Sequence, residues 1–137
     1  MLIISLSVKA GDFVRTSDGI IVHPDAAFSG NAKEVQLKVV ADNIIRIVAV
    51  VDKEMQPLQS LIITGGNTVA KFDVTNTRQS VALKTSKLTA VVSLQTGTVS
   101  FFDASGKPMV GEKELGRSIQ AQVFEGEKLY SIRQDFT

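Results

Sequence analysis

The sequence predicts an all-β fold, specifically an antiparallel β-sandwich. Apolar and polar residues alternate with a period of two over short segments, which places alternate side chains on opposite faces of a sheet. Turn-forming residues recur at short intervals between these segments, and the helical signal is weak throughout. The chain has 137 residues, and a domain of that size buries roughly two thirds of its unfolded surface. We therefore expect a single domain over 1–137, without repeats or linkers.

The first strands are predicted over 34–40 and 44–51. Val35, Leu37 and Val39 alternate with polar neighbours, which indicates a strand with one buried face. Asp42 and Asn43 then supply turn chemistry before the second run. The run over 44–51 is apolar at nearly every position, so we expect a central strand with both faces covered.

The rest of the chain continues this pattern. Its clearest hairpin joins strands over 88–94 and 99–101 through the turn at 95–97. A final strand is expected over 129–136, with Tyr130, Ile132 and Phe136 on one face. The stretch from Val110 to Arg117 is the one candidate for a turn of helix, but Gly111 and Gly116 bracket it and it lacks an apolar stripe of useful length, so its helical signal is weak. Further turns are predicted at Gly65-Gly66-Asn67, Thr75-Asn76-Thr77, Lys84-Thr85-Ser86 and Asp103-Ala104-Ser105-Gly106.

Composition limits the classes of partner. Fifteen Lys and Arg against fourteen Asp and Glu give a net charge of +1, so no long-range field attracts nucleic acid or an anionic membrane. There is no cysteine, which excludes disulfides and thiolate metal sites. The apolar run Leu2-Ile3-Ile4 is too short for a signal peptide or a membrane span. Localisation stays open, with the periplasm or the exterior expected if a signal peptide has been removed.

His23 is the single histidine, and it stands in the tripeptide His23-Pro24-Asp25. The same tripeptide marks the helical J-domain co-chaperones, but here it follows a β-type run, so we interpret it as a strand-ending turn with a partly exposed histidine. A Ser-His-Asp triad has no support, because no Gly-x-Ser-x-Gly elbow occurs in the chain.

Two carboxylate pairs are candidates for a glycosidic acid and base: Glu112 with Glu114, and Glu125 with Glu127. Each pair lies beside a lysine in a Gly-containing segment, which is typical of a solvated turn, so we predict surface charge. Gly106-Lys107 lacks both the first Walker glycine and the following Ser or Thr. We assign no catalytic, cofactor-binding or metal-ligating residue and expect no cofactor.

A series of segments, taken in order, resembles the N-terminal region of family 31 glycoside hydrolases, the α-glucosidases and α-xylosidases. Their order and spacing over 18–136 carry the resemblance. The segments are Asp18–Val22, Val35–Ile47, Ser60–Ile63, Phe72–Val74, Val81–Leu88, Thr96–Lys107 and Tyr130–Phe136.

The resemblance implies a galactose-mutarotase-like sandwich that precedes a (β/α)₈ barrel carrying both catalytic aspartates. No such barrel motif occurs here, so this chain alone is expected to be no enzyme, while the parent hydrolyses α-linked glucosides or xylosides. The catalytic barrel of the parent chain is the expected partner, and carbohydrate is the parent's substrate. We further expect an incomplete sandwich whose open edges favour a homo-oligomer.

Three alternatives remain open: a free-standing carbohydrate-binding module, a mutarotase acting alone and a purely structural sandwich. The absence of Trp and the single Tyr argue against the binding module, because sugar platforms rely on flat aromatic faces. A lone histidine in an early loop argues against the mutarotase.

Overall fold

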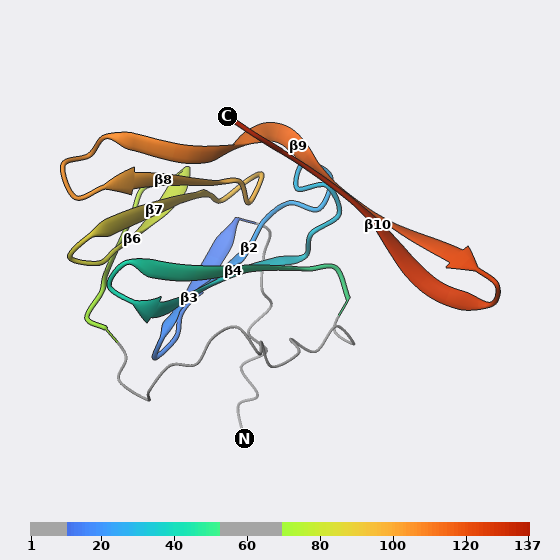
Figure 1. Cartoon of the computed structure of the whole chain (residues 1–137), viewed down its shortest axis with the longest axis horizontal. Helices are drawn as coiled ribbons and strands as arrows, with labels where there is room; N and C mark the ends of the chain where they lie inside the picture. Colours follow the sequence, from blue (N-terminus) through green and yellow to red (C-terminus); the bar gives the residue numbers. More distant parts are fainter. Residues whose placement is uncertain (1–10, 53–69) are drawn as a thin grey trace, which may run out of the picture.

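The computed structural model describes residues 11–52 and 70–137, which form two antiparallel sheets packed face to face (Figure 1). One sheet has the order β1-β2-β3-β4 and the other the order β10-β9-β8-β7-β6-β5, with every pair antiparallel. The predicted antiparallel sandwich is confirmed. The strands are β1 (Asp12–Arg15), β2 (Gly19–His23), β3 (Glu34–Ala41), β4 (Ile44–Val50), β5 (Asp73–Asn76), β6 (Ser80–Lys84), β7 (Leu88–Ser93), β8 (Val99–Asp103), β9 (Pro108–Phe124) and β10 (Glu127–Phe136).

The core lies between the sheets and follows the predicted alternation. Val35, Leu37 and Val39 are almost fully buried on β3, while their neighbours on the other face are partly or fully exposed. β6 and β7 contribute the facing layer in the same way, through Val81, Leu83, Ala90 and Val92. Burial of side chains of this size stabilises each by about 1.5–3 kcal/mol. The core therefore accounts for the register of the central strands.

Most predicted turns lie where expected within the described ranges, but the turn predicted at Thr75-Asn76-Thr77 begins only at Thr77, because β5 runs to Asn76. β7 and β8 form a hairpin with Gly97 in the left-handed region, at a φ of 68°. In the next turn Asp103 Oδ1 accepts hydrogen bonds from the amides of Ser105 and Lys107, each at 2.9 Å. Hydrogen bonds from Ser105 and from these amides lower the pKa of Asp103. The Leu2-Ile3-Ile4 run and the Gly65-Gly66-Asn67 turn lie outside the described residues.

The prediction of a central strand over 44–51 is wrong for the described chain. Among the described residues, β4 is the edge strand of its sheet, next to β3 alone, and its side chains are mostly half-buried. Ile45, Ile47 and Ala49 pack against the core. The apolar residues of β4 that do not face the core need no neighbouring strand to bury them. An edge strand that borders a groove is stabilised when the side chains on both of its faces are partly buried.

The stretch 110–117 contains no turn of helix, because β9 runs through all of it. Gln134 of β10 pairs with Arg117 while Phe136 pairs with Glu112, so β9 carries extra residues opposite two positions of β10. Leu115 takes a φ of 56° in this β-bulge. A bulge bends the strand and interrupts its regular pairing, so β9 changes direction here.

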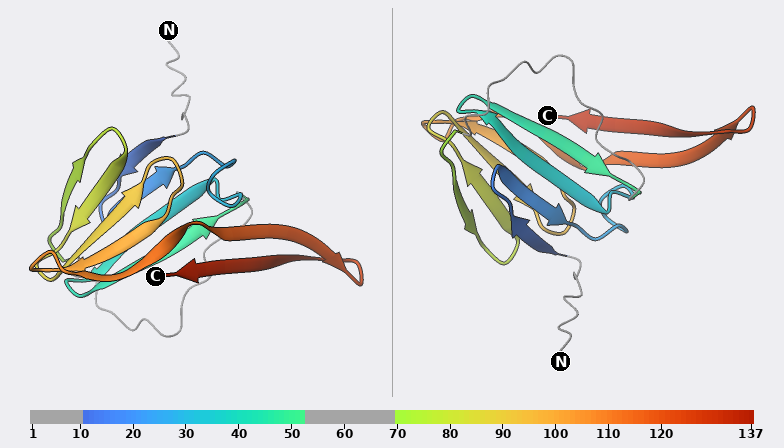
Figure 2. Two further views of the ribbon diagram at one scale, coloured as in Figure 1. Left: turned by 90° about the horizontal axis from the view of Figure 1, so that it is seen from above. Right: turned by 90° about the horizontal axis from the view of Figure 1, so that it is seen from below.

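The two sides of the sandwich, where the edge strands of the sheets face each other, are closed differently. Where β1 meets the start of β5, the guanidinium of Arg15 lies 4.9 Å from the ring centroid of Phe72 and also donates to the Phe72 carbonyl. At the opposite side, β4 and β10 are the terminal strands. β9 and β10 then leave the body together as a long hairpin, called the arm below (residues 118–133; Figure 2).

Candidate functional site

A groove of about 510 Å³ opens between β4 and the C-terminal strands. Its walls come from Arg46–Ala49 on one side and from β8, β9 and β10 on the other. Most of its lining is apolar, and Ile132 and Phe136 both face it, in agreement with the shared face predicted for β10. The sequence offered no signal for the groove itself, because it forms only when two distant edge strands face each other.

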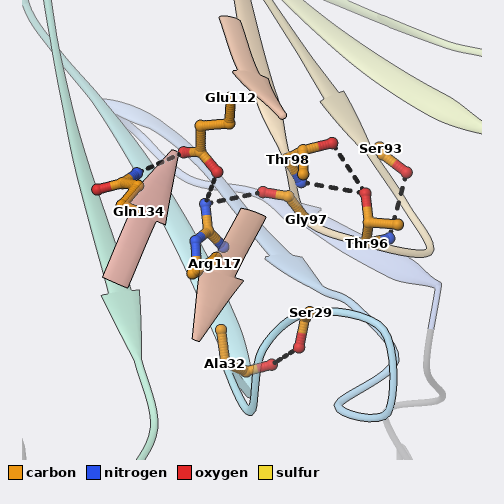
Figure 3. Close-up of polar contacts among 9 residues, drawn as sticks. All are labelled: Ser29, Ala32, Ser93, Thr96, Gly97, Thr98, Glu112, Arg117 and Gln134. Carbon is orange, nitrogen blue, oxygen red and sulfur yellow. Dashed lines mark hydrogen bonds and ion pairs between the residues drawn. The ribbon is translucent and has the colours of Figure 1, made fainter. Parts of the chain in front are cut away.

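A buried polar cluster lies at the end of this groove (Figure 3). Arg117 Nη2 donates to Glu112 Oε2 at 2.5 Å, and both side chains are 4% exposed. Gln134 Nε2 donates to the second carboxylate oxygen, Oε1, at 2.9 Å. Arg117 Nη2 also reaches the Gly97 carbonyl at 3.3 Å, whereas Nη1 is buried with no hydrogen-bond partner among the described residues. Both oxygens of Glu112 are thus engaged inside the protein.

The cluster is positioned by the bulge in β9, by the β7–β8 turn and by the small size of Gly97. The bulge in β9 brings Glu112 next to Arg117, five residues further along. The β7–β8 turn presents the Gly97 carbonyl, and Thr96 stabilises that turn by hydrogen bonds with Ser93 and Thr98 (Figure 3). A Cβ on Gly97 would lie 2.9 Å from Val35, so only glycine fits between the two sheets there.

The loop between β2 and β3 holds the root of the arm. The Ile119 amide donates to the Gly30 carbonyl at 2.9 Å, and the Asn31 side chain donates to the Ile119 carbonyl at 3.0 Å. A Cβ on Gly30 would come within 1.9 Å of the Arg117 carbonyl oxygen. Ser29 closes the loop by donating to the Ala32 carbonyl at 2.6 Å (Figure 3). The arm therefore leaves the sandwich from a fixed point at Ile119.

The surface role predicted for Glu112 is wrong, because that side chain is buried against Arg117. Glu114, Glu125 and Glu127 are exposed, as predicted for surface charge. A glycosidase needs two carboxyl groups that flank a bond about 5–10 Å apart, one as acid and one as nucleophile or base. Glu112 has no second carboxylate among the residues lining the groove. Of these four residues, only Glu112 lines the groove.

His23 ends β2, and its side chain is 19% exposed, as predicted for a strand-ending histidine. Its Nε2 lies 3.6 Å from Glu34 Oε1, while Nδ1 is buried without a partner among the described residues. Asp25 caps the following turn by accepting the Ala27 amide at 3.0 Å. Across 11–52 and 70–137, no group of three His, Cys, Asp or Glu could hold a metal ion. The same ranges hold no helix long and apolar enough to cross a membrane.

No protein-family model matches the chain. The crystal structure of a GH31 α-xylosidase from Xanthomonas citri is similar to it, with a TM-score of 0.77 and 39% sequence identity. The chain resembles part of a family 31 glycoside hydrolase. This confirms the resemblance read from the sequence, and the likeness covers 90% of this chain. The likeness spans 13% of the α-xylosidase chain.

Proposed function

We propose that this chain is a non-catalytic N-terminal accessory domain of a family 31 glycoside hydrolase, and that it packs against the catalytic (β/α)₈ barrel and supports it. The match to 13% of a GH31 α-xylosidase, at 39% identity, carries the proposal. In this view residues 1–137 form one mutarotase-like sandwich of a multidomain chain. The parent hydrolyses α-linked xylosides or glucosides, and the α-xylosidase neighbour favours xylosides.

The polar chemistry of the described residues supports a structural role. The carboxylate of Glu112 is 4% exposed, and each of its oxygens accepts a hydrogen bond from inside the domain, one from Arg117 and one from Gln134. The groove beside it is mostly apolar, and a mostly apolar surface is suited to packing against protein.

The test compares hydrolysis of p-nitrophenyl α-xyloside and α-glucoside by the isolated 137-residue chain and by the full-length chain that carries it. We expect no hydrolysis by the isolated chain and turnover by the full-length enzyme. Deleting residues 1–137 from the full-length chain is expected to lower its thermal midpoint and its soluble yield. Hydrolysis by the isolated chain that is lost in Glu112→Gln would overturn the proposal, as would a reading frame that ends at Thr137.

A further inference from the structure

The two faces of the arm differ in polarity. Residues paired across β9 and β10 share a face, so the register assigns Val123, Ala121 and Ile119 to one face together with Lys128, Tyr130 and Ile132. The opposite face carries mostly polar side chains. These are Ser118, Gln120, Gln122, Glu127, Ser131 and Arg133, with Phe124 and Leu129 at the tip.

The apolar face, called the inner face below, continues the interior of the sandwich. Ile119 is 5% exposed at the root of the arm, and its cross-strand partner Ile132 lines the groove. Ile132 itself is 65% exposed. Further along the arm the same face is open to solvent, where Val123 is 77% exposed. An inner face that starts in a core and ends in solvent is typical of a surface completed by another layer of protein.

Side-chain contacts hold the arm near the end of β4. Lys128, near its tip, lies 3.3 Å from Asp52 just beyond the end of β4, and its ammonium stands 5.6 Å from the Tyr130 ring centroid. These contacts connect the tip of the arm to the end of the opposite sheet. The groove and the inner face share Ile119 and Ile132, so they adjoin and form one surface along β9 and β10.

We infer that this continuous surface, the inner face of the arm together with the β4–β10 groove, is where the rest of the family 31 enzyme chain packs. The inference rests on the proposed function and names the surface that performs it. The partner is an apolar surface of the same polypeptide. Two observations favour it over a second copy: the inner face is continuous with the core of this domain, and the matched enzyme is far longer than this chain. The free edge of β10 within the described residues also offers backbone hydrogen bonds to that partner.

The test places aspartate on either face of the same strand pair. Val123→Asp and Ile132→Asp carry the charge on the inner face, while Gln122→Asp and Ser131→Asp are their exposed neighbours on the opposite face. Each variant is made in the isolated chain and in the full-length enzyme, and thermal unfolding is followed in both. Trypsin cleavage after Lys128 is timed in the two wild-type forms.

In the isolated chain, all four variants should unfold within about 2 °C of wild type, because the replaced side chains are exposed. In the full-length enzyme, only the two inner-face variants should lower the midpoint, by 4 °C or more. Cleavage after Lys128 should be at least tenfold slower in the full-length enzyme. Equal shifts on both faces, or equal cleavage rates, overturn the inference while leaving hydrolytic activity of the full-length enzyme intact. A full-length enzyme that dimerises, with dimerisation lost only in the inner-face variants, also overturns it in favour of a second copy.

Discussion

Replacing Arg117 with methionine removes the cation from the buried cluster while keeping an unbranched apolar side chain of similar length. Glu112 would then remain 4% exposed with Gln134 as its one hydrogen-bond partner. Breaking a buried ion pair by removing one member costs about 3–5 kcal/mol. Because Gln134 still serves Oε1, and because Arg117 Nη1 already lacks a partner among the described residues, we expect the lower end, about 3 kcal/mol.

Urea denaturation followed by far-UV circular dichroism measures this loss. The double variant Glu112→Leu/Arg117→Met removes both charges, and it should return to within about 1 kcal/mol of wild type. Arg133→Met is the matched control, since its pair with Asp135 is exposed, solvent screens it, and its loss should change the stability far less than the loss of Arg117. A loss under about 1 kcal/mol for Arg117→Met, or a double variant no more stable than it, would refute the reasoning.

Three further predictions concern the sandwich itself. Leu83→Ala, at a fully buried position, should lower the free energy of unfolding in urea by about 2–5 kcal/mol, and a loss below 1 kcal/mol would contradict its place in the core. Gly30→Ala should cost more than Gly106→Ala by calorimetry, because both have positive φ but only Gly30 has a carbonyl oxygen within 1.9 Å of the new Cβ; equal losses would count against the close contact. The hydrogen bond from Lys38 lowers the pKa of Asp18, so this stabilisation is present above the unfolded pKa of about 3.9 and is lost as the pH falls through the lower folded value. Asp18→Asn should therefore cost up to about 1 kcal/mol near pH 6 and nothing near pH 2, and a loss independent of pH would contradict this origin.

Local patterns were sufficient to predict much of the sandwich. The alternation around Val35 and Leu37 and the turn at Gln95–Gly97 depend on residues adjacent in sequence, so β3 and the β7–β8 hairpin follow directly. Val81 and Leu83, two residues apart on β6, are both fully buried. The period of two in the sequence and the packing of the core therefore select the same register.

The bulge in β9 and the role of Glu112 could not be predicted in this way. Both depend on how β9 pairs with β10 after the chain has reversed, and on the Gly97 carbonyl supplied from another turn. A glutamate beside lysine in a Gly-containing segment is most often solvated, and only Arg117, brought close by the bulge, makes its burial favourable. The edge position of β4 has the same kind of cause. A strand that is apolar at nearly every position suits a central place or the border of a groove, and only the topology distinguishes them.

Hydrogen–deuterium exchange of the arm, compared between the isolated chain and the full-length enzyme, tests the central claim most directly. Backbone amides of the arm that point away from the β9–β10 ladder should exchange quickly in the isolated chain, since much of the arm is exposed. If the rest of a family 31 enzyme packs on the inner face and along β10, exchange over residues 119–134 should slow at least tenfold in the full-length enzyme. Equal exchange rates in the two forms would contradict the account.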